Sequence, residues 1–302
     1  MISRLGKGIL VLLVALALTP VVVEAEVGAV YESGISIQVS GPYILSIIED
    51  GDPVTAAWTR HSPLLGSRQV LNQDGATNGD GLPSVVFNPI SGLPIVAWGK
   101  NNGSGFDIVE SHFENGAWTT PAIIVAGVAT SIDPEPSIAL DRQTGDVHIV
   151  YLTDDAAPKV MHTEATASLA SWTTPVQVSE IGEKALRPSA VIHQGTLTVA
   201  YESHGSGVGS APRQITIATS DGLGGFTHET IATTHNGNPN RPQLHTGMGT
   251  SLWIDWLDDP NDMAWAMWQP VMGWGFVQIE PFTDIEDRDY HARGRVKRLV
   301  TQ

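Results

Sequence analysis

Cysteine is absent from the 302 residues, so the chain forms no disulfide and has no thiolate nucleophile or cysteine-ligated zinc. Basic residues are also scarce, because 16 lysines and arginines stand against 32 aspartates and glutamates, for a net charge of −16. Nucleic-acid phosphates and anionic lipids repel such a chain, so we expect no nucleic-acid partner. A chain of this length buries enough surface to fold without disulfides.

Long hydrophobic runs are absent beyond the first 25 residues, which have the pattern of a secretory signal peptide. Two basic residues precede the apolar run Ile9–Leu18, and Val23 and Ala25 suit positions −3 and −1 of a cleavage site. An uncleaved membrane anchor is the alternative, but Pro20 interrupts the run and leaves it short for a span. We therefore predict a secreted or extracytoplasmic protein with no membrane span after cleavage, divided into a signal peptide (1–25), a folded domain (26–283) and a polar tail (284–302).

Four prolines recur at intervals of 52 to 54 residues and mark an internal repeat: Pro83, Pro136, Pro188 and Pro242. Serine follows the first three prolines. Each proline precedes an apolar segment that ends at a turn glycine: Gly92, Gly145, Gly195 and Gly249. A second apolar segment then reaches an aromatic residue: Trp98, Tyr151, Tyr201 and Trp256.

Each repeat continues with a third alternating segment, at Ile108–His112, Lys159–Thr163, Ile215–Thr219 and Met263–Met267. It closes on another aromatic: Trp118, Trp172, Phe226 and Trp274. Because these closing aromatics recur at one register, we interpret them as packing between neighbouring units, in preference to sugar-binding platforms.

An incomplete copy precedes the four regular ones. It starts at Pro42, turns at Gly51 and reaches Trp58, which leaves room for about three strands. The alternating segment Ile35–Val39 could supply a missing outer strand either to this copy or to the last unit.

Four short strands in a unit of about 50 residues, with glycine, asparagine and aspartate at the turns, are typical of a β-propeller blade. We predict an all-β fold, a β-propeller with five blades of four-stranded antiparallel sheet, with six blades as an alternative. A β-sandwich or solenoid is the rival architecture. Neither explains the fixed spacing between proline and aromatic.

The segment SDGLGGFT, Ser220–Thr227, resembles the Asp-box turn Ser-x-Asp-x-Gly-x-Thr-Trp of sialidase-like propellers. Asp221 stands one position early, and Phe226 precedes the threonine instead of following it. The resemblance covers residues 36–283 through spacing more than identity. It implies a propeller fold, since in that family the box is a structural turn between third and fourth strands.

Sialidases also carry an Arg-Ile-Pro step whose arginine joins two others in binding a carboxylate, beside a Tyr–Glu nucleophile pair. Arg187-Pro188 and Arg241-Pro242 are similar but lack the middle residue. Tyr201 and Glu202 are adjacent, so on a strand their side chains point to opposite faces. A complete sialidase catalytic set is therefore not assigned.

The loops that precede the first strand and follow the second strand of each blade share one face of a propeller, the usual binding face. Residues that vary between copies at these loops are the candidates for function. Several are basic in an acidic domain, which favours an anionic sugar or carboxylate as ligand. The candidate ligand-binding residues are Arg60, Lys100, Glu135, Arg187, Glu202 and Arg241.

We therefore expect a ligand-binding or interaction module, with a glycan or anionic small ligand as the leading partner and a protein surface as another. An exo-acting glycoside hydrolase, sialidase- or furanosidase-like, is the alternative, because Asp80, Asp133, Glu135 and Glu202 could supply paired carboxylates. A purely structural surface protein is the third possibility; it would neither turn over nor bind glycans.

Metal sites find little support in the sequence. Asp74–Gly81 and Asp258–Asp262 are rich in oxygen ligands, but neither completes an EF-hand. The histidines form no His-Glu-x-x-His pattern, and we assign His112 and His162 to one register of the repeat with a structural role. We predict no cofactor, with structural calcium as the open alternative.

Overall fold

The computed structural model describes residues 35–40, 43–49, 54–60, 65–71, 80–88, 91–153, 157–204, 213–233, 239–246, 251–259 and 262–281, with backbone alone for 35–70. These residues belong to one contact unit, Glu32–Gln302. The predicted signal peptide and polar tail lie outside the described residues. Over the described ranges, no helix has the length and hydrophobicity to span a membrane.

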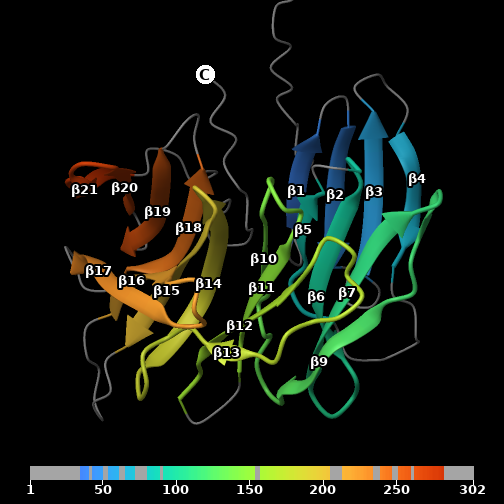
Figure 1. Ribbon diagram of the computed structural model, residues 1–302, viewed down its shortest axis with the longest axis horizontal. Coiled ribbons are helices and arrows are strands. Elements are labelled where there is room, and N and C mark those ends of the chain that lie inside the picture. The colour runs from blue at the N-terminus through green and yellow to red at the C-terminus, as the bar shows by residue number, and fades with distance from the viewer. Residues whose placement is uncertain are drawn as a thin grey trace, which may run out of the picture. The chain divides into compact units, whose positions relative to one another are not determined.

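The described strands form five antiparallel sheets in chain order (Figure 1). Sheet 1 contains β1 (Ile35–Ser40), β2 (Tyr43–Glu49), β3 (Val54–Arg60) and β4 (Leu65–Val70). Sheet 2 contains β5 (Ser84–Phe87), β6 (Pro94–Asn101), β7 (Phe106–Glu114), β8 (Ala117–Trp118) and β9 (Ala122–Ala129). Sheet 3 contains β10 (Ser137–Leu140), β11 (Val147–Leu152), β12 (Val160–Ala165) and β13 (Val176–Gln177).

The last two sheets follow the same order. Sheet 4 contains β14 (Lys184–His193), β15 (Thr196–His204), β16 (Arg213–Ser220) and β17 (Phe226–Thr233). Sheet 5 contains β18 (Asn240–Thr246), β19 (Leu252–Asp259), β20 (Asp262–Gln269), β21 (Gly273–Trp274) and β22 (Gln278–Pro281). The all-β fold and the β-propeller architecture with five blades are confirmed.

Turns with a glycine in left-handed backbone join the first two strands of sheets 2, 3 and 4. Gly92, Gly145 and Gly195 take φ values of 68°, 82° and 75°, a region that favours glycine because it has no Cβ. Gly249 lies outside the described residues. The predicted turn glycines of sheets 2, 3 and 4 are therefore at the turns.

The outermost strand is interrupted in two of the sheets. In sheet 2, β8 and β9 both pair with β7, and Pro121 lies between them. In sheet 5, β21 and β22 both pair with β20. A proline lacks the N–H that a strand ladder needs, which explains the break in sheet 2. Sheets 2 and 5 thus count five strands instead of the predicted four.

The first strands of neighbouring sheets contact one another in order, β1 with β5, β5 with β10, β10 with β14 and β14 with β18. Serine hydroxyls join three of these contacts. The hydroxyls of Ser84, Ser137 and Ser189 accept backbone N–H groups of the next sheet, from Ile138 (3.1 Å), Ala190 (3.0 Å) and Leu244 (2.9 Å). The serine that follows a repeat proline therefore connects one blade to the next.

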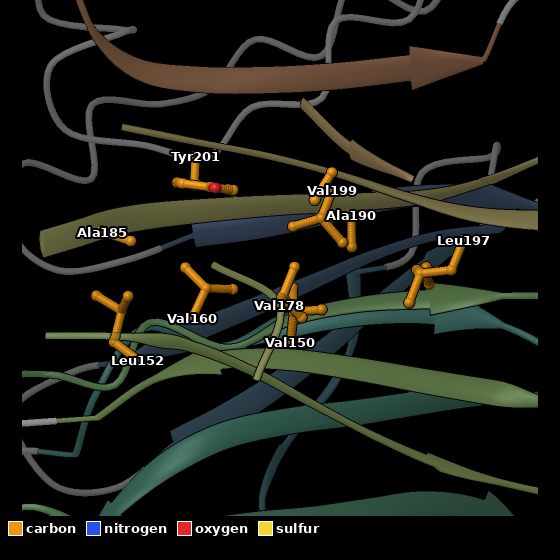
Figure 2. Close-up of a cluster of buried hydrophobic side chains, with 11 residues drawn as sticks. Val150, Leu152, Val160, Val178, Ala185, Ala190, Leu197, Val199 and Tyr201 are labelled. Atoms are coloured by element: carbon orange, nitrogen blue, oxygen red, sulfur yellow. The ribbon is translucent and has the colours of Figure 1, made fainter. Parts of the chain in front are cut away.

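Apolar side chains fill the space between adjacent sheets. Figure 2 shows one such cluster, where Tyr201 and Val199 of sheet 4 face Val150, Leu152 and Val160 of sheet 3. The closing aromatics Trp172, Phe226 and Trp274 are partly buried against clusters that combine two sheets each. Trp118 packs against Val85 and Trp98 of its own sheet, in a cluster that also contains Leu71, the residue after β4. The predicted role in packing between units is therefore confirmed for Trp172, Phe226 and Trp274.

The register assigned to the incomplete first copy is wrong. Pro42 lies between β1 and β2 instead of ahead of a first strand, because Ile35–Ser40 itself forms that strand and pairs with β2. Trp58 consequently lies on β3, the third strand of its sheet, and not on a second strand. Ile35–Ser40 therefore belongs to sheet 1, one of the two expected alternatives, but it forms the first strand, in contact with β5, and not the expected outer strand.

Candidate functional site

We call the edge where each first strand begins and each second strand ends the proline edge, since the repeat prolines lie there. The residues just before three of these prolines have positive φ: 43° for Glu135, 52° for Arg187 and 54° for Arg241. Left-handed backbone is costly for a residue with a Cβ, and a following proline restricts it further. Such strain persists where the surrounding fold imposes it and often marks a site.

Two of these residues lie at irregularities in the sheet. The pairing of β14 with β15 shifts between Leu186 and Ser189, and that of β18 with β19 shifts between Asn240 and Gln243. Arg187 and Arg241 lie within these two shifts. A bulge redirects the side chain at the irregularity, so both arginines leave the regular alternation of their strands.

Glu202 connects these two arginines. Its side chain is fully buried near the end of β15. Oε1 accepts a hydrogen bond from Arg187 Nη1 at 2.5 Å and another from the backbone N–H of Arg241 at 2.9 Å. Nε2 of His204 lies 3.5 Å from Oε2. One carboxylate therefore holds together the beginnings of the first strands of sheets 4 and 5.

The electrostatics of Glu202 favour its ionised form. Burial alone would raise its pKa, but the neighbouring His204, the Arg187 guanidinium and the backbone N–H of Arg241 together outweigh that effect. The net result is a pKa below the ordinary value. Glu202 is therefore a carboxylate anion that stabilises the junction, in contrast to the raised pKa typical of a general acid.

Asp133 makes a similar connection at the proline edges of sheets 2 and 3. Oδ2 accepts the backbone N–H of Leu82 at 2.8 Å, and Oδ1 accepts that of Glu135 at 2.9 Å. Leu82 and Glu135 precede the repeat prolines of those sheets. Gly81 is required beside this carboxylate, because a Cβ there would lie 2.1 Å from Asp133 Oδ1.

Two further aspartates lie at this edge. Asp80 is buried, and its Oδ1 accepts the backbone N–H of Asn101 at 2.8 Å. Asp258 is 2% exposed, and its Oδ2 has no hydrogen-bond partner among the described residues. Leu257 pairs with Asn240, so Asp258 lies at the same edge of sheet 5 as Arg241. The sequence singles out Asp258 only as the start of an oxygen-rich segment, and its unpaired oxygen is visible only in the structure.

The structure brings together three of the six predicted site residues, Arg187, Glu202 and Arg241. Lys100 near the end of β6 and Glu135 before β10 lie at the proline edges of sheets 2 and 3. Arg60 ends β3, a third strand, at the edge of sheet 1 opposite to the one where β1 begins. Its side chain lies outside the described residues. A ligand-binding role for the six residues stays a prediction.

The segment that resembles an Asp-box lies at the predicted turn, between the third and fourth strands of sheet 4. Asp221 Oδ1 accepts the backbone N–H groups of Leu223 (2.7 Å) and Gly225 (2.9 Å). These two bonds hold the pKa of Asp221 below its usual range. The aspartate thus organises the turn, and the Asp-box assignment itself stays a prediction.

The ladder corrects one assignment of histidines. His112 pairs with Ile95, three residues before Trp98, whereas His162 pairs with Val150, one residue before Tyr151. The two histidines therefore occupy different registers, and the residue equivalent to His112 is Glu164. Most of the oxygen-rich segment Asp74–Gly81, and two residues of Asp258–Asp262, lie outside the described residues, so the calcium alternative stays open.

Comparison with known proteins finds likeness in structure but not in sequence. No protein-family model matches the chain. No curated protein matches it either.

Several solved structures share the fold at low sequence identity. A lectin from Burkholderia pseudomallei has a TM-score of 0.56 at 10% identity, with 79% of this chain and 66% of the lectin covered. An ulvan lyase has a TM-score of 0.55 at 10% identity, with 78% and 66% covered. A Hadza microbial sialidase has a TM-score of 0.52 at 13% identity, with 78% and 54% covered. The chain thus spans about half of the sialidase, and these likenesses show the fold alone.

Proposed function

We propose that this chain is a secreted carbohydrate-binding β-propeller that takes an anionic glycan at the proline edge of sheets 4 and 5. The observation that carries the proposal is the junction at Glu202, which draws Arg187 and Arg241 together from consecutive sheets. The site brings two arginines to one edge, together with the carboxylates of Glu202 and Asp258, in a chain of net charge −16 that has few basic residues. A planar guanidinium suits the carboxylate of a uronic or sialic acid and the sulfate of a sulfated sugar.

The geometry leaves Arg187 capable of binding. Its side chain is 31% exposed, and its contact with Glu202 engages Nη1. A guanidinium carries five N–H donors, so a ligand can take a bidentate pair while the contact with Glu202 remains. Glu202 then acts as the residue that positions the arginine, since a buried carboxylate has no surface to offer a sugar.

The names of the structural neighbours support this ligand class. They are a lectin, a sialidase and an ulvan lyase bound to a GlcA(1-4)Rha3S unit. That unit combines a uronic acid with a sulfated sugar, both of them anionic. Ligand chemistry varies widely on one fold, so this support concerns the class of ligand and not its identity.

The test is binding of the purified chain to an array of uronate-containing, sulfated, sialylated and neutral glycans. We expect signals confined to the anionic set, and a loss of affinity of at least about tenfold in Arg187→Ala and in Arg241→Ala. Arg142→Ala is the matched control. It removes the same charge from the exposed turn between β10 and β11, at the opposite edge of sheet 3.

Folding and binding are separated by a second variant. Arg187→Lys keeps the charge and the contact with Glu202 but loses bidentate geometry, so it should fold like the wild type and bind more weakly. Urea midpoints measured for all variants identify any that unfold. If the alanine variants bind as Arg142→Ala does, the proposed site is wrong.

Glycoside hydrolysis is the second candidate, favoured by one observation. Asp258 Oδ2 and Glu202 Oε2 are buried carboxylate oxygens at this edge without a hydrogen-bond partner among the described residues, so the edge offers two carboxylates for catalysis. Turnover of a chromogenic glycoside panel that disappears in Asp258→Asn would establish a hydrolase. Glu202→Gln and Asp133→Asn are the companion variants. If the chain shows no turnover and binds no glycan, a protein-interaction or structural role remains.

A further inference from the structure

A second cluster of titratable side chains lies on sheet 3, at the edge opposite to the proline edge. We call this the hairpin edge, because first strands turn into second strands there. His148 on β11 pairs directly with Glu164 on β12, and His162 pairs with Val150. Side chains two residues apart on a strand share a face, so the two histidines and the glutamate project from one face of the sheet.

The ligand atoms of these three residues converge. His148 Nδ1 lies 3.1 Å from His162 Nε2 and 3.1 Å from Glu164 Oε2, and His162 Nε2 lies 3.9 Å from the same oxygen. A point equidistant from the three atoms lies about 2 Å from each, the length of a Zn–N or Zn–O bond. The three atoms are therefore close enough together for one ion to contact all of them.

Hydrogen bonds alone do not satisfy this cluster. A neutral imidazole nitrogen either donates or accepts, so His148 Nδ1 makes a full hydrogen bond to one of its two neighbours and not to both. The other close contact, also 3.1 Å long, is then left without a well-directed hydrogen bond of its own. A divalent cation removes the conflict, because all three atoms are electron-pair donors.

Neighbouring side chains pack against the cluster. The ring planes of His148 and His162 lie 16° apart with centroids 5.3 Å apart. Phe226 from sheet 4 makes a T-shaped contact with His162, with ring centroids 6.1 Å apart. This packing limits the movement of the His162 ring.

The cluster opens into a cavity of about 270 Å³ between sheets 3 and 4. Leu197, Asp221 and Gly222 of sheet 4 line its other side. Figure 2 places Leu197 at one end of the apolar cluster and Tyr201, the neighbour of Glu202, towards the other end. The cavity is thus separate from the junction at Glu202.

We propose that His148, His162 and Glu164 bind a Zn²⁺ ion whose fourth coordination position faces this cavity. Two histidines and one glutamate are a known ligand set for zinc sites that keep an open position. The open position would take water or a small anionic ligand. Asp221, which lines the cavity, adds negative charge that favours a bound cation.

The equivalent place in sheet 2 supplies a natural comparison. His112 there lies between two carboxylates, with Nδ1 2.7 Å from Glu110 Oε1 and Nε2 3.9 Å from Glu114 Oε2. The two contacts involve different nitrogens of one ring, so a single metal ion cannot use both. His112 therefore gives a matched control: a histidine among carboxylates that lacks the converging geometry.

The experiment is calorimetric titration of the untagged full-length chain, treated with chelator and dialysed, with Zn²⁺. We expect one saturable site per chain and a rise in the melting temperature with Zn²⁺ concentration. His148→Ala and Glu164→Gln should each weaken binding at least about tenfold, since each removes a ligand. His112→Ala should bind Zn²⁺ as the wild type does.

The variants also separate binding from folding. His162 is buried, so His162→Ala can lose binding through misfolding, but the Glu164 side chain is 46% exposed and Glu164→Gln keeps its shape. The visible spectrum of bound Co²⁺ reports whether the site is tetrahedral. The absence of saturable binding overturns the proposal, as does binding that Glu164→Gln and His148→Ala leave intact or that His112→Ala weakens equally.

Discussion

The proline edge and the hairpin edge of this propeller use carboxylates in opposite ways. At the proline edge, Glu202 Oε1 and both oxygens of Asp133 accept hydrogen bonds from the residues that precede the repeat prolines. At the hairpin edge, Glu164 faces ring nitrogens of His148 and His162, and His148 Nδ1 can make a well-directed hydrogen bond to only one of its two close neighbours. A carboxylate bonded to backbone holds the scaffold together, whereas one that faces histidines retains capacity for a ligand.

The largest expected effect concerns the proline edge. Glu202→Ala removes a fully buried carboxylate and leaves Arg187 and the N–H of Arg241 without their acceptor. We expect a loss of roughly 3 kcal/mol in the free energy of unfolding, typical of breaking a buried pair. Urea denaturation measures it. Glu229→Ala, an exposed glutamate on β17, is the control and should change stability little.

Acid should weaken the same junction. The folded-state pKa of Glu202 lies below the ordinary 4.5, so its contribution is present above that value and is lost as pH falls through the folded pKa. The charged and titratable groups that face it are Arg187 and His204, with the backbone N–H of Arg241. We expect the stability advantage of the wild type over Glu202→Gln to be constant above about pH 5 and to shrink below it. An advantage that grows on acidification would contradict this sign.

The repeat was visible in the sequence because its recurring residues have a physical role, which is clearest in sheets 2, 3 and 4. A proline opens the first strand, a serine after it connects to the next sheet, and a glycine with positive φ turns the hairpin. Where the recurring proline has another position, the predicted strand register was wrong. Sheet 1 has its proline between β1 and β2, so a register based on proline counted it as the start of a unit.

The two clusters of side chains differ in how far the sequence predicts them. Arg187, Glu202 and Arg241 follow from propeller topology, which places the residues before a first strand beside those at the end of a second. The cluster of His148 and Glu164 depends on the pairing of β11 with β12, which the sequence pattern does not specify to one residue. The sequence did offer one signal for this cluster. Apolar and polar residues alternate within 147–152 and 160–165, and this alternation puts His148 and His162 on one face of the sheet.

A smaller effect, on Zn²⁺ affinity, should appear at the hairpin edge. Asp221 lines the cavity from sheet 4 and lies outside the three converging ligands. Asp221→Asn keeps an oxygen for the N–H groups of Leu223 and Gly225 but removes a negative charge. We expect Zn²⁺ affinity to fall by about two- to threefold at low salt and to be restored to wild type at about 0.5 M salt, where charges are screened. A loss as large as that of Glu164→Gln would instead make Asp221 a ligand.

The smallest expected effect tests whether local turn chemistry sets the hairpin edge. Two-residue turns join β7 to β8 through Asn115-Gly116, with φ values of 50° and 84°, and β14 to β15 through Gln194-Gly195, with 52° and 75°. Two positive φ angles define a type I′ turn, which favours asparagine at its first position. Gln194→Asn should therefore stabilise the chain by about 0.5 kcal/mol, and Asn115→Gln should destabilise it by a similar amount. Because Gly195 also lines the cavity, unchanged Zn²⁺ binding in Gln194→Asn would show that the turn supports the hairpin edge without shaping the metal ligands.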